Sequence, residues 1–405
     1  MIATQNSAVI AAGLALPEEI APWPADQRPG TAAIDSATNR IPSLDGLRAI
    51  SIFMVVAGHW ASVQYASQVA LSYAYLGVRI FFIISGYLIT TLLIKEQSRT
   101  STISLGDFYL RRAYRILPAA MAFMPVFVVY WSRLRWYDMT AAALYLANFD
   151  PLRPWFLGHL WSLSVEEQFY FVWPSVLKKW YQHRIGILAA VALFAPIFRL
   201  ACYALKLPQA GNDSFPAVAD NLAIGCLLAI LAPRIPEIKP WLGFLMMFPV
   251  ILVPTYLAVT RLHTLVLLFF LWPLLHLSVA GILLHIVRNP LRLLNLGPVV
   301  WLGKISYSLY LWQQLFAYNP HSRPWYAPLY ALGLACLSYY LVEQPMLRMR
   351  QRRTRDRRSP AAATVPHPES ERATLADSPR KSHSDVKKAG PNLSVVKDRP
   401  RFVPS

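Results

Sequence analysis

The sequence lacks several patterns that would point to a familiar class of function. It has only 3 cysteines in 405 residues, Cys202, Cys226 and Cys336, and they do not have the spacing of metal ligands. We read them as small core residues and predict no metal site. No internal repeat is visible, so the paired-half architecture of many secondary transporters has no support. No aromatic-interleaved basic module accompanies the net charge of +18, so nucleic acid is not a predicted partner.

Long apolar runs are what the sequence has instead. It is 55% hydrophobic and 15% charged, and the charged residues are gathered in particular segments. This composition is typical of a membrane protein. We predict an all-α, polytopic fold with about ten transmembrane helices. The predicted spans are residues 46–66, 74–94, 116–133, 160–177, 186–205, 217–232, 241–259, 264–286, 298–318 and 326–345.

Basic residues predict the orientation of these spans, because short connections rich in Lys and Arg stay in the cytoplasm. The even-numbered connections are the basic ones, which places both termini in the cytoplasm and the protein in the inner (cytoplasmic) membrane. The alternation requires that 138–150 does not cross, so we expect an external loop there. The basic connections contain Arg99, Arg111, Arg112, Arg115, Lys178, Lys179, Arg184, Arg234, Lys239, Arg288 and Arg292.

Three regions follow from composition. Residues 1–43 lack the basic start of a signal peptide and are predicted to be a flexible cytoplasmic extension. Residues 44–348 form the membrane domain. Residues 349–405 are basic and without periodicity, and we predict a disordered cytoplasmic tail. A basic segment next to the membrane most often contacts anionic membrane lipids.

Two ionisable residues lie eleven positions apart on the first apolar run, Arg48 and His59. On a helix this spacing is about three turns and roughly 16 Å, so both side chains project from one face at different depths. Ionisable groups at membrane depth usually line a polar cavity with a function. The alternative is a snorkelling arginine and a satisfied core histidine.

A cluster of arginines, Arg111, Arg112 and Arg115, opens the third predicted span. Residues three and four apart share a helix face, and guanidinium groups match phosphate oxygens in pairs. The cluster therefore predicts a clamp for a soluble phosphorylated donor. Ordinary positive-inside topology explains most basic loops of this kind and remains open as the alternative.

Two adjacent acids, Glu166 and Glu167, enter the fourth predicted span within WSLSVEEQFY. Acids at this depth are unlikely to face lipid, whereas the aromatic residues around them fit an interfacial belt. A carboxylate that met His59 would fix the tautomer of the imidazole and raise its basicity, as a general base requires. Ser85 has no identifiable base and no Gly-x-Ser-x-Gly elbow, so we interpret it as a packing residue.

Taken in order, these segments resemble the acyltransferase-3 family of membrane acyltransferases, over roughly residues 40–348. One position departs from many relatives, which have histidine where this chain has Gln313. Glutamine can hydrogen-bond but cannot take a proton at neutral pH. The resemblance rests on Leu44 to Arg48 with His59, Gly77 to Leu88, Arg111 to Pro118, His159 to Tyr170, Asp220 with Gly225, Gly303 to Trp312, and Glu343 to Pro345.

The resemblance implies an O-acyltransferase that moves an acyl group from cytoplasmic acyl-CoA to a hydroxyl of a glycan or lipid-linked sugar. The expected donor is acetyl-CoA or another short acyl-CoA. The arginine cluster and Arg48 would bind it, and His59 would act as general base or acyl carrier. Glu167, with Glu166 as substitute, would orient His59. Without an appended hydrolase-like domain, we expect a stand-alone form.

Two other functions remain open from the sequence. A glycolipid transporter or flippase would use the intramembrane histidine and acids as a proton relay, although it has no need of an arginine cluster on one side. An inactive relative would act only as a membrane scaffold. The sequence does not indicate the oligomeric state.

Overall fold

The structure is a computed structural model that describes residues 42–259, 267–317 and 325–358, and every regular element in these ranges is helical. Most of the predicted N-terminal extension and C-terminal tail, residues 1–41 and 359–405, lies outside the described residues. The α-helices are α2 (Pro42–Tyr65), α3 (Gln68–Thr100), α4 (Leu105–Phe123), α5 (Pro125–Val129), α6 (Trp136–Ala143), α7 (Leu160–Lys179), α8 (Arg184–Ala204), α9 (Pro208–Asp213), α10 (Phe215–Leu231), α11 (Pro240–Leu245), α12 (Met247–Val259), α14 (Trp272–Arg288), α15 (Gly297–Lys304), α16 (Ser306–Ala317), α17 (Ala327–Ser338) and α18 (Gln344–Arg358).

Shorter helical turns join these helices. The two π-helical turns have bulged hydrogen-bond registers and continue directly into α14 and α18. The short elements are η1 (Trp131–Arg133), η2 (Ala147–Phe149), η3 (Trp155–Leu157), η4 (Tyr181–His183), η5 (Ala232–Arg234), η6 (Leu267–Leu271), η7 (Arg292–Asn295) and η8 (Tyr339–Glu343).

Six stretches within the described residues are long and apolar enough to cross a membrane as single helices. The predicted multi-pass membrane architecture is therefore confirmed. The six are Ser43–Tyr65, Gln68–Thr100, Leu105–Val129, Tyr181–Ala204, Ala210–Arg234 and Phe269–Arg288.

The remaining four predicted spans have a different form. The span at 160–177 is the helix α7, which contains two acids and Pro174. Two others, 241–259 and 298–318, are each divided between two short helices, and 326–345 runs from α17 through the π-helical turn η8 into α18. An apolar window cannot reveal such breaks, because it averages over the residues where the helix turns.

The segment 138–150 contains only the eight-residue helix α6 and a short turn. At 1.5 Å per residue α6 is about 12 Å long, too short to cross the bilayer. Arg135 fastens the segment through hydrogen bonds to Asp138 and to Asp150, whose carboxylate oxygens lie 2.8 and 2.9 Å from Nη2 of Arg135. Burial would raise the pKa of Asp138, but the hydrogen bonds from Arg135 hold this pKa below its usual range.

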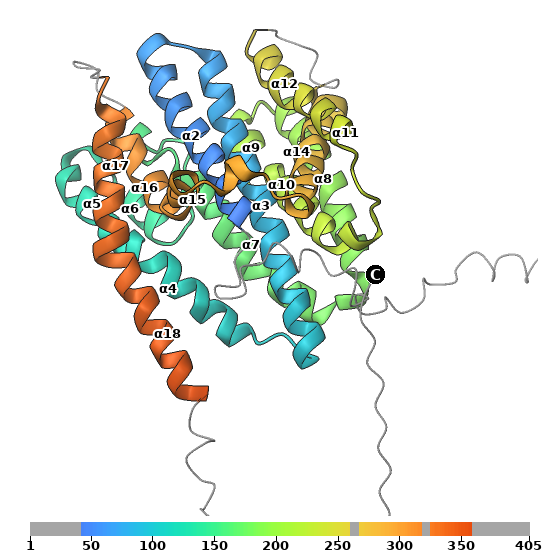
Figure 1. Cartoon of the computed structure of the whole chain (residues 1–405). Coiled ribbons are helices and arrows are strands. Elements are labelled where there is room, and N and C mark those ends of the chain that lie inside the picture. Colours follow the sequence, from blue (N-terminus) through green and yellow to red (C-terminus); the bar gives the residue numbers. More distant parts are fainter. Residues whose placement is uncertain (1–41, 260–266, 318–324, 359–405) are drawn as a thin grey trace, which may run out of the picture. The chain divides into compact units, whose positions relative to one another are not determined.

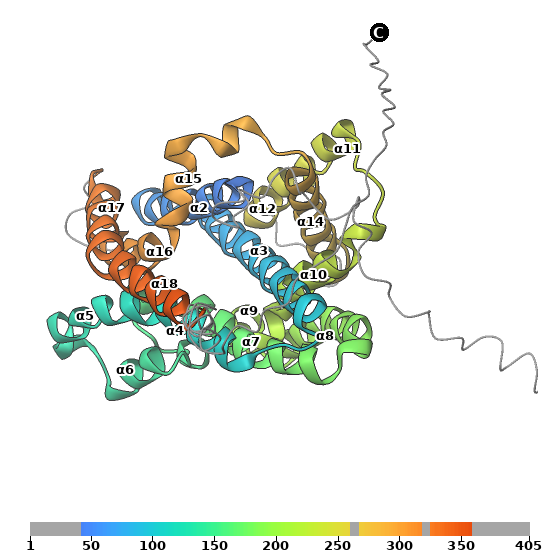
Figure 2. The same ribbon diagram turned by 60° about the horizontal axis from the view of Figure 1, so that its bottom comes forward.

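The long helix α3 packs against α2 on one side and α10 on another (Figure 1). Gly86 of α3 and Gly225 of α10 let the two backbones touch: a Cβ on either glycine would lie 2.2 Å from a carbonyl oxygen of the other helix. Small residues allow this close approach in membrane helices. Figure 2 shows α3 running between α10 and α2, with α4 and α7 on the opposite side from α15.

A buried network of charged residues ties α3, α8, α10 and α14 together. Nη2 of Arg199 donates to Asp220 at 2.9 Å, and Nδ1 of His276 lies 3.5 Å from the same carboxylate oxygen. The guanidinium of Arg79 lies 3.6 Å above the ring of Trp272 and 3.5 Å from Nε2 of His276. His276 thus contacts Asp220 and Arg79 within this network, and Arg79 does not face lipid alone.

Two compact units divide the chain at Gln351. Of the second unit, only 352–358, the end of α18, is described. The predicted start of the tail at 349 therefore falls inside a helix. Arginine and glutamine, which dominate this stretch, are good helix formers.

Candidate functional site

Helix α2 carries both residues that the sequence singled out. It is unbroken from Pro42 to Tyr65, so Arg48 and His59 lie on nearly the same face, about 16 Å apart along the axis. Arg48 is mostly buried and its Nη1 lies 3.9 Å from Asp45. His59 is half-buried. The two residues therefore place one ionisable side chain towards each end of the same helix face.

The partner of His59 comes from α16. Nδ1 of His59 and Oε1 of Gln313 are 3.0 Å apart, although 254 positions separate the two residues. The indole of Trp155 meets the imidazole edge-on, with 6.2 Å between ring centroids. The imidazole is thus held by an amide and an aromatic ring.

The beginning of α7 is bound to the same part of α16. The hydroxyl of Tyr310 donates to the backbone carbonyl of His159 at 3.1 Å and lies 2.5 Å from the hydroxyl of Ser162. The neighbouring Gln314 donates to the carbonyl of Trp155 at 2.6 Å. Glycine is required at position 158, because a Cβ on Gly158 would lie only 2.8 Å from the side-chain amide nitrogen of Gln314.

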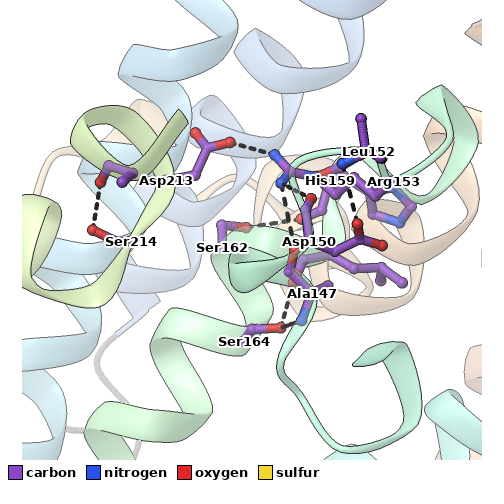
Figure 3. Close-up of polar contacts among 12 residues, drawn as sticks. Ala147, Asp150, Leu152, Arg153, His159, Ser162, Ser164, Asp213 and Ser214 are labelled. Carbon is purple, nitrogen blue, oxygen red and sulfur yellow. Dashed lines mark hydrogen bonds and ion pairs between the residues drawn. The ribbon is translucent and has the colours of Figure 1, made fainter. Parts of the chain in front are cut away.

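Arg153 fastens the loop that leads into α7 (Figure 3). Its guanidinium donates to the carbonyls of Asp150 at 3.0 Å, Gly158 at 3.3 Å and Ala147 at 3.4 Å, and it forms a buried ion pair with Asp213. One side chain therefore joins the loop that carries Trp155 to α9.

The three arginines of α4 have three different partners. Nη2 of Arg111 binds Glu96 at 3.0 Å, and Glu96 also accepts from the backbone N–H of Ser104, which closes the turn between α3 and α4. The guanidinium of Arg112 lies 3.6 Å over the ring of Tyr170. Arg115 is attracted electrostatically to Asp45 of α2, and the like-charged Arg48 lies near it as well. One arginine of the predicted cluster thus lies near Arg48.

The two acids of α7 lie near these arginines. Glu166 accepts hydrogen bonds from the hydroxyls of Ser85 and Tyr170. Glu167 lines a cavity of about 440 Å³ together with Arg112 and Gln168, and it interacts electrostatically with both Arg112 and Arg115. The carboxylates are therefore part of the arginine-containing region.

The predicted contact between Glu167 and His59 is not among the contacts of the described residues. His59 is bound by Gln313 instead. The reason is rotational: on α7, the turn with His159 and Ser162 binds α16, whereas Glu166 faces Ser85 of α3. Successive helix residues point about 100° apart, so one rotation of α7 decides which side chain meets His59.

Sequence reasoning missed several residues around His59. Tyr310 and His159 belong to the quoted motifs but have no predicted role, and no sequence pattern singles out Arg153. No local pattern marks Trp155 or the pairing of Gln313 with His59, because the contacts join segments far apart in the chain. The substitution of histidine by Gln313 was the only available signal.

Comparison with known families decides the relationship. The family model described as an acyltransferase domain matches residues 41–343. The chain belongs to this acyltransferase-3 family. The match includes every residue predicted for the site, from Arg48 to Glu167.

Two curated members of the acyltransferase-3 family show the extent of the similarity. The peptidoglycan O-acetyltransferase OatA of Listeria monocytogenes is 27% identical over 318 residues, which are 67% of this chain and 48% of that protein. The O-acetyltransferase OatA of Staphylococcus aureus is 29% identical over 315 residues, 67% of this chain and 50% of that protein. The chain thus spans about half the length of these relatives. No solved structure matches it.

Proposed function

We propose that this chain is an integral-membrane O-acyltransferase that moves an acyl group, acetyl in the simplest case, from acyl-CoA to a hydroxyl of a glycan or glycolipid. Relatives named O-acetyltransferases support the reaction class. The observation that carries the proposal is the pair of ionisable residues on one face of α2, with arginines of α4 near Arg48 and a held imidazole at His59.

The donor would bind at the arginine-rich region. CoA carries phosphates at one end and the thioester at the end of an extended arm. Arg48, Arg112 and Arg115 supply guanidinium groups that match phosphate oxygens, and Arg111 would stabilise the region through Glu96. Glu166 and Glu167 would act here, where they balance the positive charge, rather than beside His59.

The transfer would take place at His59. Nε2 of the imidazole removes the proton of the acceptor hydroxyl while the hydroxyl oxygen attacks the thioester carbonyl. The C–S bond then breaks, and the departing thiolate of CoA takes the proton from the imidazolium. An acyl-imidazole on His59 would be the two-step form of the same transfer.

The topology that fits this scheme has the Arg48 end of α2 and both termini in the cytoplasm of a cell with the protein in its inner membrane. The basic connections all fall on that side of the predicted alternation. A hydroxyl acceptor would then approach from the side of His59. Labelling of single cysteines placed at Thr100 and at Leu152 with a membrane-impermeant reagent tests this orientation, since only the second should react in intact cells.

The proposed reaction is tested with purified protein in lipid nanodiscs and acetyl-CoA labelled in the acetyl group. We expect release of CoA thiol and transfer of label to surface glycan extracts, and loss of both in His59→Ala. His285→Ala is the matched control, because Nδ1 of His285 binds the carbonyl of Ile238, away from this site. Movement of a glycolipid across the bilayer without any acyl transfer would favour the transporter instead.

A further inference from the structure

Gln313 is the one side chain hydrogen-bonded to the imidazole of His59 among the described residues. It is only 3% exposed, and it lies on α16 between Trp312 and Gln314. Its amide oxygen is the atom that faces Nδ1 of His59, at 3.0 Å. Its amide nitrogen has no hydrogen-bond partner among the described residues.

The orientation of the Gln313 amide determines the tautomer of His59. Its oxygen faces Nδ1 at 3.0 Å, and because an amide oxygen only accepts hydrogen bonds, Nδ1 carries the proton in this orientation. In a neutral imidazole the lone pair then lies on Nε2. Trp155, edge-on to the same ring, restricts its rotation. Nε2 is therefore the basic nitrogen, and its direction is fixed.

Among the described residues, no carboxylate is hydrogen-bonded to His59. Glu166 is engaged by Ser85 and Tyr170, and Glu167 lies in the cavity with Arg112. The titratable group near His59 at the start of α7 is His159, and the interaction between the two rings disfavours a positive charge on both at once. The nearby Arg153 is paired with Asp213. The surroundings of His59 thus favour the neutral imidazole.

We propose that Gln313 is the positioning residue of His59, taking the role that a carboxylate has in most histidine bases. An amide fixes the tautomer but does not stabilise the imidazolium as strongly as a carboxylate does. His59 therefore stays unprotonated to lower pH than it would beside an acid. This inference rests on the proposed function, because it assigns the group that orients the general base of that reaction.

The unpartnered amide nitrogen argues against a purely packing role. A buried donor without a partner costs free energy, and an apolar side chain of similar volume would avoid this cost. A residue retained only to fill space in α16 would have no need of an amide. The amide oxygen is the part of Gln313 that is hydrogen-bonded to His59. The experiment therefore compares a variant that loses this oxygen with one that keeps an acceptor oxygen.

Three variants test the proposal, each assayed for acetyl transfer at several pH values. Gln313→Met removes the acceptor and keeps the volume; we expect kcat to fall about 10-fold to 100-fold, with the KM for acetyl-CoA unchanged. Gln313→Glu keeps an acceptor oxygen; we expect near-normal kcat, with the acid limb of the pH profile about one pH unit higher, because the carboxylate stabilises the imidazolium. Gln64→Met is the control, an amide on the same helix as His59 whose oxygen has no partner.

The outcomes separate the inference from the function on which it rests. Acetyl transfer that persists in His59→Ala would overturn both. Loss in His59→Ala together with a wild-type kcat in Gln313→Met and an unmoved acid limb in Gln313→Glu would overturn the inference alone. If Gln313→Met fails to fold, as judged by thermal unfolding and gel filtration, the acid limb of Gln313→Glu decides, since a merely structural role would not move it.

Discussion

The two polar regions on α2 differ in charge. Around Arg48 the neighbours are charged: Asp45 lies 3.9 Å from its guanidinium, and Arg115 of α4, which interacts with Glu167, lies near it. Around His59 the contacts are an amide and an indole. The difference suits two tasks, since a charged donor requires charges to hold it, whereas a general base must remain neutral until it takes a proton.

The largest expected effect is at His59. In His59→Ala we expect kcat for acetyl transfer to fall about 10²-fold to 10⁴-fold, the usual contribution of a general base. The KM for acetyl-CoA should stay near its normal value, because the phosphates bind elsewhere. Steady-state kinetics in nanodiscs measure both quantities. A rise in the KM for acetyl-CoA as large as the fall in kcat would mean that His59 also binds the donor and is not separate from the arginine-rich region.

The next largest effect is expected at Arg153, which fastens the loop that leads into α7. Arg153→Met leaves the buried carboxylate of Asp213 without its arginine, and breaking a buried ion pair costs about 3–5 kcal/mol. The loop that carries Trp155 would loosen, so we expect a lower midpoint of thermal unfolding and a reduced kcat. Arg133→Met, on an exposed arginine of the preceding turn, is the control. An unchanged midpoint in Arg153→Met would contradict the anchoring role.

The arginine-rich region should affect binding of the donor. In Arg112→Ala we expect the KM for acetyl-CoA to rise about tenfold or more, since a hydrogen bond to a charged group is worth roughly 1.5–3 kcal/mol. Arg111→Ala should raise it less, because Arg111 is already paired with Glu96. The KM of the wild type should also rise with salt. Equal rises in KM for Arg112→Ala and Arg111→Ala would show that the pairing of Arg111 with Glu96 does not limit its contribution to donor binding.

The smallest effect distinguishes the two regions most directly. Glu167→Gln should change kcat by no more than about fivefold, because a partly exposed carboxylate near an arginine contributes about 0–1 kcal/mol. The kcat of Glu167→Gln is measured in the same assay, and with the same protein preparation, as that of His59→Ala. A loss as large as that in His59→Ala would restore Glu167 as the orienting acid of the base.

The sequence predicted the parts of this arrangement that depend on local pattern. Apolar length revealed α2 and α3, and the spacing of Arg48 and His59 placed both on one face. The donor-binding role of the arginines and Arg48 remains a prediction. The helices and their shared face could be predicted because helical periodicity is local.

The contacts between helices that are far apart in the chain could not be predicted from the sequence. Whether Glu166, Glu167 or neither meets His59 depends on the rotation of α7, which is set by Tyr310 and Ser162 at its start. The break within 298–318 depends likewise on how α15 and α16 pack against α2. A single sequence carries no record of such pairings.

The hydrogen bond between His59 and Gln313 also has a consequence for biosynthesis. The two residues are 254 positions apart, so the ribosome must deliver nearly the whole membrane domain before the bond can form. The arginine-rich region, from α2 to α7, is complete much earlier. A nascent chain released before α16 would therefore contain the arginine-rich region without the amide that holds His59.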